Sequence, residues 1–300
     1  MNRELQKKLI NLCGGNVFFD HALSNRTSIG IGGKADAWIN VVDLETLQKT
    51  FNFLKRAEVK IKVVGNASNI LFQESGFEGV IIKLSGDFFN GFKIKDNVVT
   101  AGGGTSLGKL IIACCRSGLG GLEGTAGIPA TIGGAVKMNA SYKSAVSEKL
   151  LRVLILDKQG KYVWRGKDEI KFGYRSSSFG REEIITQAEF CLEKVPASDL
   201  NEKFSIFLRA KTERQPLTEK TSGCIFKNPE ESVGSSGELI DRAGMKGARR
   251  GEAMVSKKHA NFIVNTGGAS SADVITLMED IQKKVKGTFN INLEPEIEIL

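Results

Sequence analysis

Residues 119–140, LGGLEGTAGIPATIGGAVKMNA, carry the clearest chemical signal in this sequence. Six glycines lie in this segment, beside alanines, threonines and a single proline. Glycines allow several backbone N–H groups to approach one anion, so the backbone itself is the part that can bind a ligand. A flexible linker is the alternative, but linkers are poor in apolar residues. This segment has apolar residues that can pack, namely Leu122, Ile128, Ile132, Val136 and Met138. The pattern favours a packed loop that cradles phosphate groups.

A second loop of small residues, GNASN at 65–69, follows an expected strand at 60–65. Two such loops can hold one pyrophosphate from opposite sides through backbone N–H groups. The usual nucleotide fingerprints do not explain them. The run 102–108 lacks the G-x-G-x-x-G spacing, and no GxxxxGK[ST] motif occurs. The sequence therefore disfavours an ordinary Rossmann or P-loop protein, and ordinary tight turns remain the alternative for both loops.

Two further positions have side chains suited to catalysis. Tyr174 and Arg175 lie in FGYRSSSF, where a fixed guanidinium could bind a carboxylate through two hydrogen bonds. The plainer interpretation is a surface arginine beside a packed tyrosine. Cys224 lies in SGCIFKNP. A single cysteine is most often a small buried apolar residue, but a thiol near its usual pKa of about 8.5 is also protonated at neutral pH and can donate a proton.

The elements that position these residues follow from the spacing of apolar side chains. Helices are expected at 4–13, 43–56, 105–116, 197–214, 236–244 and 271–286. Strands are expected at 36–42, 60–65, 79–84, 97–101, 184–192, 260–265 and 290–300, with a hairpin at 151–158 and 161–164. The order predicts an α+β architecture with a boundary near 205–215. On the final strand, period-two alternation puts three glutamates on one face and does not choose among Glu294, Glu296 and Glu298.

Composition limits the function classes. The 300 residues are 41% hydrophobic, enough for two or three folding units. No apolar run is long enough to span a membrane, and the first residues lack the apolar region of a signal peptide. Five cysteines without a CxxC motif predict reduced thiols in a cytoplasm, and two histidines argue against a histidine-rich metal centre. The net charge of +8 is spread without a basic block, which favours small phosphorylated ligands over nucleic acid.

Six motifs occur in one order along the chain: Thr27 with Gly32-Gly33; GNASNIL at 65–71; Gly124 to Ala140; GYRS at 173–176; GCIFKNP at 223–229; and LEPE at 293–296. Together they resemble the UDP-N-acetylenolpyruvoylglucosamine reductases, from about residue 22 to the C-terminus. The resemblance implies an enzyme of peptidoglycan precursor synthesis that binds FAD non-covalently and uses NADPH.

The resemblance also implies the fold and the FAD site. Two subdomains, 1–85 and 86–208, would clasp FAD in the manner of vanillyl-alcohol oxidase. A third, 209–289, would bind the substrate, and strand 290–300 would return to the first. The implied cofactor-binding residues are Gly65, Asn66, Ala67, Ser68, Asn69, Gly124, Gly127, Ile128, Pro129, Thr131, Gly133, Gly134 and Ala135.

By the same resemblance, Arg175, Cys224 and Glu296 are the catalytic residues. Hydride would pass from NADPH to FAD and then to the enolpyruvyl β-carbon of UDP-N-acetylglucosamine enolpyruvate. Cys224, where related enzymes carry serine or cysteine, would protonate the α-carbon. Arg175 and Glu296 would stabilise the enolate, and the product would be UDP-N-acetylmuramate.

The resemblance makes Tyr174, Arg214, Asn228 and His259 substrate contacts, although a helix-end arginine and a structural histidine would look the same. Only nine residues separate Tyr174 from strand 184–192, so the long tyrosine-bearing loop of some members is missing and the chain resembles the shorter subtype. Two alternatives are a flavin oxidase of the same superfamily and a non-catalytic nucleotide-binding module. The sequence does not give the oligomeric state, and a monomer is compatible with it.

Overall fold

The computed structural model describes residues 1–300, apart from the side chain of Glu231. The chain divides into two compact units, and each is assembled from three separate segments. Unit 1 comprises Met1–Phe19, Asp36–Asn66 and Glu78–Ala210. Unit 2 comprises Asp20–Ala35, Ala67–Phe77 and Lys211–Leu300. The chain therefore passes between the units several times before its last third completes unit 2.

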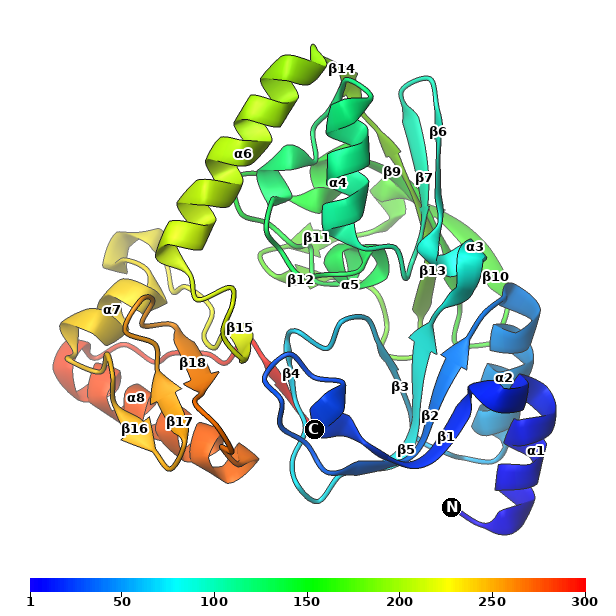
Figure 1. The fold of residues 1–300 in the computed structure, drawn as a ribbon, viewed down its shortest axis with the longest axis horizontal. Coiled ribbons are helices and arrows are strands. Elements are labelled where there is room, and N and C mark those ends of the chain that lie inside the picture. Colours follow the sequence, from blue (N-terminus) through cyan, green and yellow to red (C-terminus); the bar gives the residue numbers. More distant parts are fainter. The chain divides into compact units, whose positions relative to one another are not determined.

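The helices lie where apolar periodicity predicted them, with small shifts at their ends. They are α1 (Arg3–Cys13), α2 (Leu44–Arg56), α4 (Leu107–Arg116), α6 (Ala197–Arg214), α7 (Ser236–Arg242) and α8 (Ser271–Phe289). Helices α1 and α2 lie side by side in unit 1 (Figure 1). The expected N-cap of α2 is confirmed, because a carboxylate oxygen of Asp43 accepts the Thr46 N–H at 2.7 Å. Two short helices, α3 (Gly86–Asn90) and α5 (Ile132–Lys137), were not predicted.

Unit 1 is built on a five-stranded sheet in the order β10-β9-β13-β7-β6, in which every neighbouring pair is antiparallel. Its strands are β6 (Phe92–Lys95), β7 (Val98–Gly102), β9 (Leu150–Leu156), β10 (Tyr162–Gly166) and β13 (Ile184–Cys191). The buried residues of this sheet share one apolar core with α4 and α5. That shared core holds the Gly-rich segment, which has little side chain of its own, in one conformation.

A four-stranded sheet in the order β1-β2-β5-β3 carries α1 and α2. Its strands are β1 (Val17–Ala22), β2 (Lys34–Val41), β3 (Ile61–Val64) and β5 (Phe77–Leu84). Strand β3 pairs with β5 in parallel, and the GNASN loop begins directly after β3. The second half of this loop already belongs to unit 2. The loop is thus a point at which the chain passes from one unit to the other.

Unit 2 contains a four-stranded sheet in the order β15-β18-β17-β16. Its strands are β15 (Thr221–Cys224), β16 (Arg249–Arg250), β17 (Ala253–Val255) and β18 (Phe262–Asn265). Helices α7 and α8 pack into one apolar core with residues of this sheet. The remaining pairs are β8 (Leu119–Gly120) with β14 (Glu193–Lys194), β11 (Phe172–Gly173) with β12 (Ser176–Ser177), and β4 (Ile70–Leu71) with β19 (Glu298–Ile299).

The expectation of a strand over 290–300 is wrong for most of its length. Only β19 pairs as a strand, in parallel with β4. Ahead of it, Pro295 forms an isolated bridge with Phe226. Residue 295 has no N–H to donate, so a regular ladder cannot continue through it. The pairing of β19 with residues 70–71 agrees with a return to the region 1–85, although both strands lie in unit 2. The three-domain partition stays a prediction.

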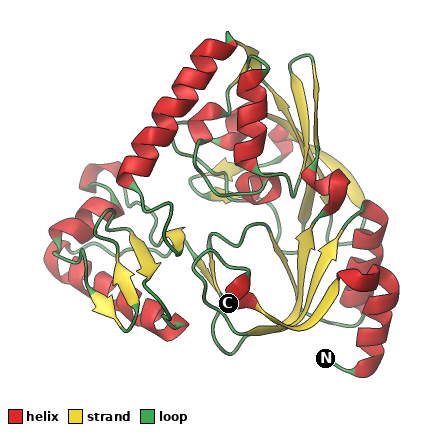
Figure 2. Ribbon diagram, viewed as in Figure 1, coloured by secondary structure: helices red, strands yellow, loops and turns green.

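Helices, strands and loops are interleaved throughout the chain, as an α+β fold requires (Figure 2). Among the described residues, no helix combines the length and the apolar character that a membrane span needs. None of the five cysteines forms a disulfide in the part of the chain that the structure describes.

Candidate active site

The two Gly-rich loops contact each other within unit 1. A Cβ placed on Gly65 would lie 2.4 Å from the Thr131 hydroxyl oxygen, well inside van der Waals distance. The side-chain amide of Asn66 donates to the Pro129 carbonyl oxygen at 3.1 Å. Glycine at position 65 is therefore a steric requirement of this contact. The two segments expected to share one pyrophosphate are in fact held together.

Backbone hydrogen bonds separate the N–H groups of the second loop into two classes. Within residues 132–135, three N–H groups are already used inside the protein: Ile132 donates to Thr105 O at 2.9 Å, Gly133 to Gly103 O at 2.8 Å, and Ala135 to Thr131 O at 2.8 Å. We therefore revise the expectation for Gly133, whose N–H is engaged and whose added Cβ would lie 3.1 Å from two carbonyl oxygens. Its N–H is not available to an anion, and close packing alone already requires a glycine here.

Gly134 differs from its neighbour. Its N–H has only a long contact, 3.4 Å, to Thr131 Oγ1, and an added Cβ would meet that same oxygen at 3.5 Å and nothing closer. A backbone that is open on the glycine side, next to a threonine hydroxyl, fits a phosphate-bearing ligand. Gly134 therefore stays a candidate contact of the cofactor.

The remaining residues of the second loop are held firmly. Gly124 fits against Ser144, since a Cβ there would lie 2.2 Å from Ser144 Oγ. Gly127 has φ +71°, a conformation that favours glycine. Ile128 packs against the apolar core of unit 1. Rigidity of this kind lowers the entropic cost of binding.

The second half of the GNASN loop lies in unit 2, where it contacts both other candidate segments. Asn69 donates its side-chain amide to the Glu296 carbonyl oxygen at 3.1 Å, and its own carbonyl accepts the Glu298 N–H at 3.0 Å. A Cβ on Gly223 would lie 3.6 Å from the Ser68 carbonyl oxygen. Ala67 has φ +46°, an uncommon conformation for a residue with a side chain. The loop thereby fixes the segments that carry Cys224 and Glu296.

Tyr174 and Arg175 form the two-residue turn of the β11–β12 hairpin, in which Gly173 pairs with Ser176. Arg175 has φ +53°, and such left-handed geometry costs about 1–2 kcal/mol for a residue with a Cβ. Its Nη1 donates to Ser141 O at 2.8 Å and to Ser141 Oγ at 2.9 Å. Tyr174 is 53% exposed. A strained, hydrogen-bonded arginine beside an exposed aromatic ring is typical of a functional turn.

Cys224 ends β15 and is half-buried, opposite Phe262 of β18. Gly223, with φ +79°, precedes it at an irregularity in the pairing. Cys191 is also half-buried, and the other three cysteines differ in their surroundings. Cys13, Cys114 and Cys115 are core residues, and burial raises the pKa of Cys114 to about 12. That thiol stays protonated and inert, so Cys224 is the better placed of these cysteines for proton transfer.

The structure distinguishes the three C-terminal glutamates. Glu294 is exposed and forms an ion pair with Lys227 at 3.2 Å, and Glu298 is exposed on β19. Glu296 is half-buried, and its backbone N–H donates to Ile225 O at 2.7 Å, next to Cys224 in the sequence. The segment of both Glu294 and Glu296 is joined to that of Cys224 within unit 2, and Glu296 is the half-buried carboxylate of the three.

The expected substrate contacts in unit 2 differ in exposure and in their hydrogen bonds. Arg214 is exposed at the end of α6. Asn228 accepts the Ser236 N–H at 3.1 Å through Oδ1 and so satisfies the first N–H of α7, whose N-cap is Ser235. His259 Nδ1 accepts the Asn261 N–H at 3.2 Å, and its ring lies edge-on to Phe262. Burial, followed by the nearby Lys246 charge, lowers the pKa of His259. These contacts give Asn228 and His259 structural roles.

Sequence reasoning missed Asn139 and Ser141, which contact the Arg175 hairpin. Asn139 Nδ2 donates to the Gly173 carbonyl oxygen at 3.0 Å. Asn139 also has φ +44°. The available signal was two polar residues at the end of an otherwise small and apolar segment.

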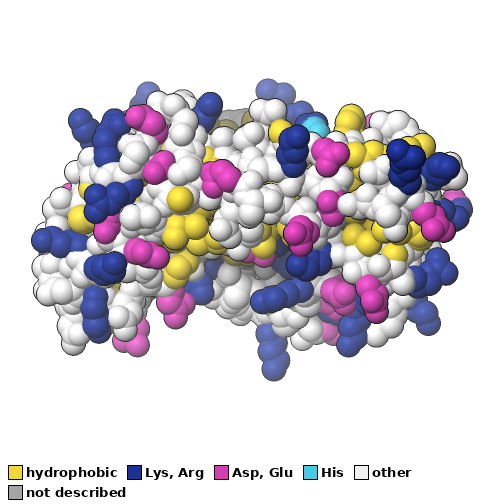
Figure 3. All heavy atoms as spheres, turned by 90° about the horizontal axis from the view of Figure 1, so that it is seen from below, with side chains coloured by type: hydrophobic (Ala, Val, Ile, Leu, Met, Phe, Trp, Pro, Cys, Tyr) yellow, Lys and Arg dark blue, Asp and Glu magenta, His cyan; other side chains and the backbone are white. Residues whose placement is uncertain are grey.

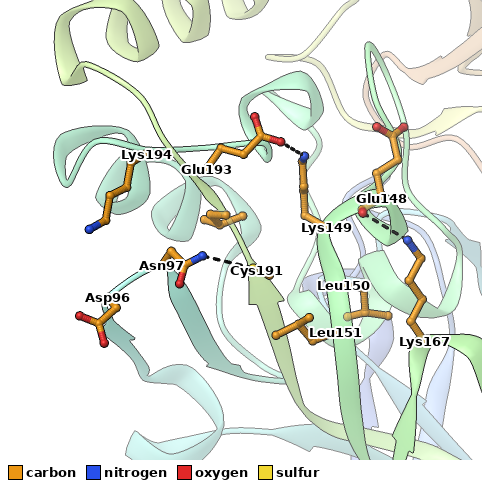
Figure 4. Close-up of a pocket in the computed structure, with 11 residues that line it drawn as sticks. Asp96, Asn97, Glu148, Lys149, Leu150, Leu151, Lys167, Cys191, Glu193 and Lys194 are labelled. Atoms are coloured by element: carbon orange, nitrogen blue, oxygen red, sulfur yellow. Dashed lines mark hydrogen bonds and ion pairs between the residues drawn. The ribbon is translucent and has the colours of Figure 1, made fainter.

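A separate cavity of about 1110 Å³ lies on unit 1, and none of the sequence-predicted site residues lines it. In this cavity the Lys149 ammonium faces the Glu193 carboxylate, and Lys167 donates to the Glu148 carbonyl oxygen at 3.2 Å (Figure 4). On the face shown in Figure 3, basic and acidic side chains are interspersed, with no continuous basic stripe. Among the described residues, no cluster of His, Cys, Asp and Glu side chains could hold a metal ion.

Comparison with known proteins identifies two families along the chain. The family described as "FAD binding domain" matches residues 35–166, and "UDP-N-acetylenolpyruvoylglucosamine reductase, C-terminal domain" matches residues 215–300. The UDP-N-acetylenolpyruvoylglucosamine reductase of Bacillus pumilus is 35% identical, covering 99% of this chain and 98% of its own. A reductase of the same name from Bacillus anthracis, numbered 1, is 37% identical, covering 99% of both chains.

Comparison with solved structures leads to the same family. The UDP-N-acetylenolpyruvylglucosamine reductase of Thermus caldophilus has a TM-score of 0.80 at 34% identity, covering 94% of this chain and 97% of its own. A glucose dehydrogenase, wild-type Phl p 4.0202, has a TM-score of 0.53 at 14% identity, covering 98% of this chain and 60% of its own, and shares the fold alone. The predicted α+β fold of the vanillyl-alcohol-oxidase type is confirmed. The chain belongs to the UDP-N-acetylenolpyruvoylglucosamine reductases, the FAD-dependent oxidoreductases of peptidoglycan precursor synthesis.

Proposed function

We propose that this chain reduces UDP-N-acetylglucosamine enolpyruvate to UDP-N-acetylmuramate, with NADPH as the reductant and non-covalently bound FAD as the carrier. Family membership supports the reaction. The observation in this chain that carries the proposal is the contact of Gly65 with Thr131, which brings the two Gly-rich loops together. FAD, when bound, accepts hydride from NADPH and delivers it to the substrate.

The two Gly-rich loops would hold the FAD pyrophosphate. Gly134 would offer an open backbone next to the Thr131 hydroxyl, and Asn66, whose amide donates to Pro129 O, would contribute from the other loop. The binding is non-covalent. His21 Nε2 accepts a hydrogen bond from Arg26 Nε at 2.9 Å, and His259 is engaged with Asn261, so both histidines already have structural partners. This supports the reductase over a histidine-tethered flavin oxidase.

Arg175 binds the substrate carboxylate and stabilises the negative charge that develops on it as hydride arrives at the β-carbon. Two hydrogen bonds from Nη1 to Ser141 fix the guanidinium before any ligand binds, which reduces the cost of organising the site. Tyr174, exposed at the same turn, contacts the substrate beside it.

Cys224 donates the proton that the α-carbon takes up, and Glu296 acts with Arg175 on the enolate. The contact of the Glu296 N–H with Ile225 O supports a shared placement of these two residues within unit 2. Arg214 and Asn228 are proposed contacts of the UDP diphosphate, Asn228 through atoms other than the oxygen that accepts the Ser236 N–H.

We place the reaction in the cytoplasm, where reduced thiols persist, which agrees with five cysteines that form no disulfide in the described chain. The boundaries 1–85, 86–208 and 209–289 remain our proposed domain partition, with the return of β19 to β4 as its support. Substrate and reductant are small molecules.

The test is anaerobic stopped-flow spectroscopy of the purified yellow protein. NADPH should bleach the flavin absorbance, and UDP-N-acetylglucosamine enolpyruvate should restore it and yield UDP-N-acetylmuramate in equal amount. A colourless protein that contains no flavin would be the nucleotide-binding module instead, and a yellow protein that keeps its flavin on acid precipitation would hold it covalently, against the proposal. Flavin that dioxygen reoxidises rapidly but the enolpyruvyl sugar does not would identify an oxidase.

A further inference from the structure

The hairpin that carries Arg175 is fastened to one short stretch of chain, residues 137–141. The Ser177 hydroxyl donates to Lys137 O at 2.5 Å, Asn139 Nδ2 donates to Gly173 O at 3.0 Å, and Arg175 Nη1 donates to Ser141. These contacts hold both arms of the hairpin and its turn. All of them lie within unit 1.

The same stretch follows directly on the Gly-rich loop. Helix α5 begins at Ile132, one residue after Thr131, and ends at Lys137. Gly134, proposed to hold FAD, lies within this helix, and Lys137, the first contact of the hairpin, is only three positions further along the chain. Helix α5 also packs against β13 in the core of unit 1, and this packing fixes the position of residues 137–141 relative to the Gly-rich loop.

Asn139 is the central contact of the three. It is 9% exposed, and it holds φ +44°, a conformation that asparagine tolerates better than most residues. Its Nδ2 reaches the carbonyl of the residue immediately before Tyr174. A carbonyl can only accept a hydrogen bond, so the amide nitrogen and not Oδ1 must face Gly173.

We propose that Asn139 is a positioning residue that holds the Tyr174–Arg175 turn, and with it the guanidinium, in the orientation that the substrate carboxylate requires; the inference rests on the proposed function of Arg175. Loss of this one hydrogen bond frees the turn, and the left-handed conformation of Arg175 then relaxes. Asn139 acts on the substrate half-reaction through Arg175 and touches no reacting atom.

The test uses Asn139→Asp, which keeps the size and the tolerance of positive φ but replaces the donor with a carboxylate that repels Gly173 O. We expect normal FAD content and a near-normal rate of flavin reduction by NADPH. Reoxidation by the enolpyruvyl substrate should slow at least about tenfold, which corresponds to the loss of one hydrogen bond in a buried setting. Asn201→Asp is the matched control, since Asn201 also donates an amide to a carbonyl, Ala197 O at 2.7 Å, on exposed α6.

A double variant separates positioning from general structure. In an Arg175→Ala background, Asn139→Asp should slow reoxidation less than twofold, because the group that it positions is gone. A tenfold loss that persists in this background, or equal slowing of both half-reactions, would overturn the inference. Should Asn139→Asp fold poorly, Ser141→Ala and the conservative Ser141→Thr replace it, with partial loss and rescue expected.

The role of Arg175 and the positioning role of Asn139 can be disproved separately. If Arg175→Ala reoxidises normally, the proposed function of Arg175 is wrong and the positioning role falls with it. If Arg175→Ala is impaired but Asn139→Asp and Ser141→Ala are both normal, only the positioning role is wrong.

Discussion

Gly65 and Thr131 are so close that the Thr131 hydroxyl oxygen occupies the space where a Cβ on residue 65 would begin, 2.4 Å away. Segments more than sixty positions apart in the sequence are therefore in steric contact at the proposed cofactor loop. Glycine is needed at position 65 because the Thr131 side chain occupies the space that a Cβ would need, whatever the backbone conformation requires.

Gly65→Ala should separate the loops, lower FAD occupancy and cost about 1–3 kcal/mol of stability through overpacking. The double variant Gly65→Ala/Thr131→Ala should recover part of the FAD occupancy and part of the stability, because the second substitution removes the oxygen that the new methyl group meets. Flavin absorbance per protein and the thermal midpoint measure these effects. A double variant no better than Gly65→Ala would show that another contact sets the loop spacing.

Gly134 and Gly133 should respond differently to the same substitution. Gly134→Ala should weaken FAD binding while leaving the apoprotein nearly as stable, since the new Cβ meets only Thr131 Oγ1 at 3.5 Å. Gly133→Ala should lower apoprotein stability as well, because two carbonyl oxygens lie 3.1 Å from its Cβ. Flavin titration and denaturation of the apoprotein test this pair. Normal FAD affinity in Gly134→Ala would remove Gly134 from the cofactor site.

Cys224→Ala should reduce its flavin with NADPH at a near-normal rate yet reoxidise slowly with substrate, by a factor of about 10²–10⁴, as expected for loss of a general acid. Cys224→Ser should retain appreciable activity because a hydroxyl can also donate the proton. Stopped-flow traces of the two half-reactions give both rates. Equal damage to both half-reactions in Cys224→Ala would indicate a structural cysteine.

Arg175→Ala and Glu296→Gln should each depress turnover far more than substrate binding, because the charge they stabilise appears only as hydride arrives. The double variant should lose less than the product of the single losses. Glu294→Gln and Glu298→Gln are controls, since both carboxylates are exposed. A control as impaired as Glu296→Gln would mean that a different carboxylate acts.

His259 should make the fold sensitive to acid. Burial first, and the Lys246 charge second, lower its pKa in the folded protein. The unfolded chain therefore binds the proton more readily, so stability is full above the unfolded pKa of about 6.5 and falls as the pH drops from there towards the folded pKa. His259→Gln should flatten this dependence in urea unfolding between about pH 7.5 and 5. An unchanged profile with a raised KM for the UDP-sugar would support a substrate contact instead.

How much the sequence predicts depends on the range of the interactions involved. The long amphipathic helices, such as α2 with its Asp43 cap, were predictable because their signals are local. The β11–β12 hairpin was not, because strands of two residues show no alternation. The final strand was overestimated because its alternation did not reveal the bridge between Pro295 and Phe226.

The site divides in the same way. Arg175, Cys224 and Glu296 could be named from their motifs, and the choice of Glu296 agrees with its half-buried position between two exposed glutamates. The contact of Asn139 with Gly173 spans thirty-four positions and depends on a positive φ at Asn139. The spacing of apolar residues reveals neither a long-range hydrogen bond nor a backbone angle. The hydrogen bond from the Gly133 N–H to Gly103 O is likewise a tertiary contact that no local sequence pattern predicts.

The discontinuous make-up of unit 2 has a consequence for how the chain is synthesised. Ile29, Ile31 and Leu71 belong to the same apolar core as residues from 225 to 297, and Leu300 exchanges backbone hydrogen bonds with Leu71 and Gln73. The early segments leave the ribosome long before their partners exist. Their apolar side chains stay without their packing partners until the last ninety residues have been synthesised. A nascent chain stalled before α7 would therefore expose apolar surface that chaperones and proteases recognise.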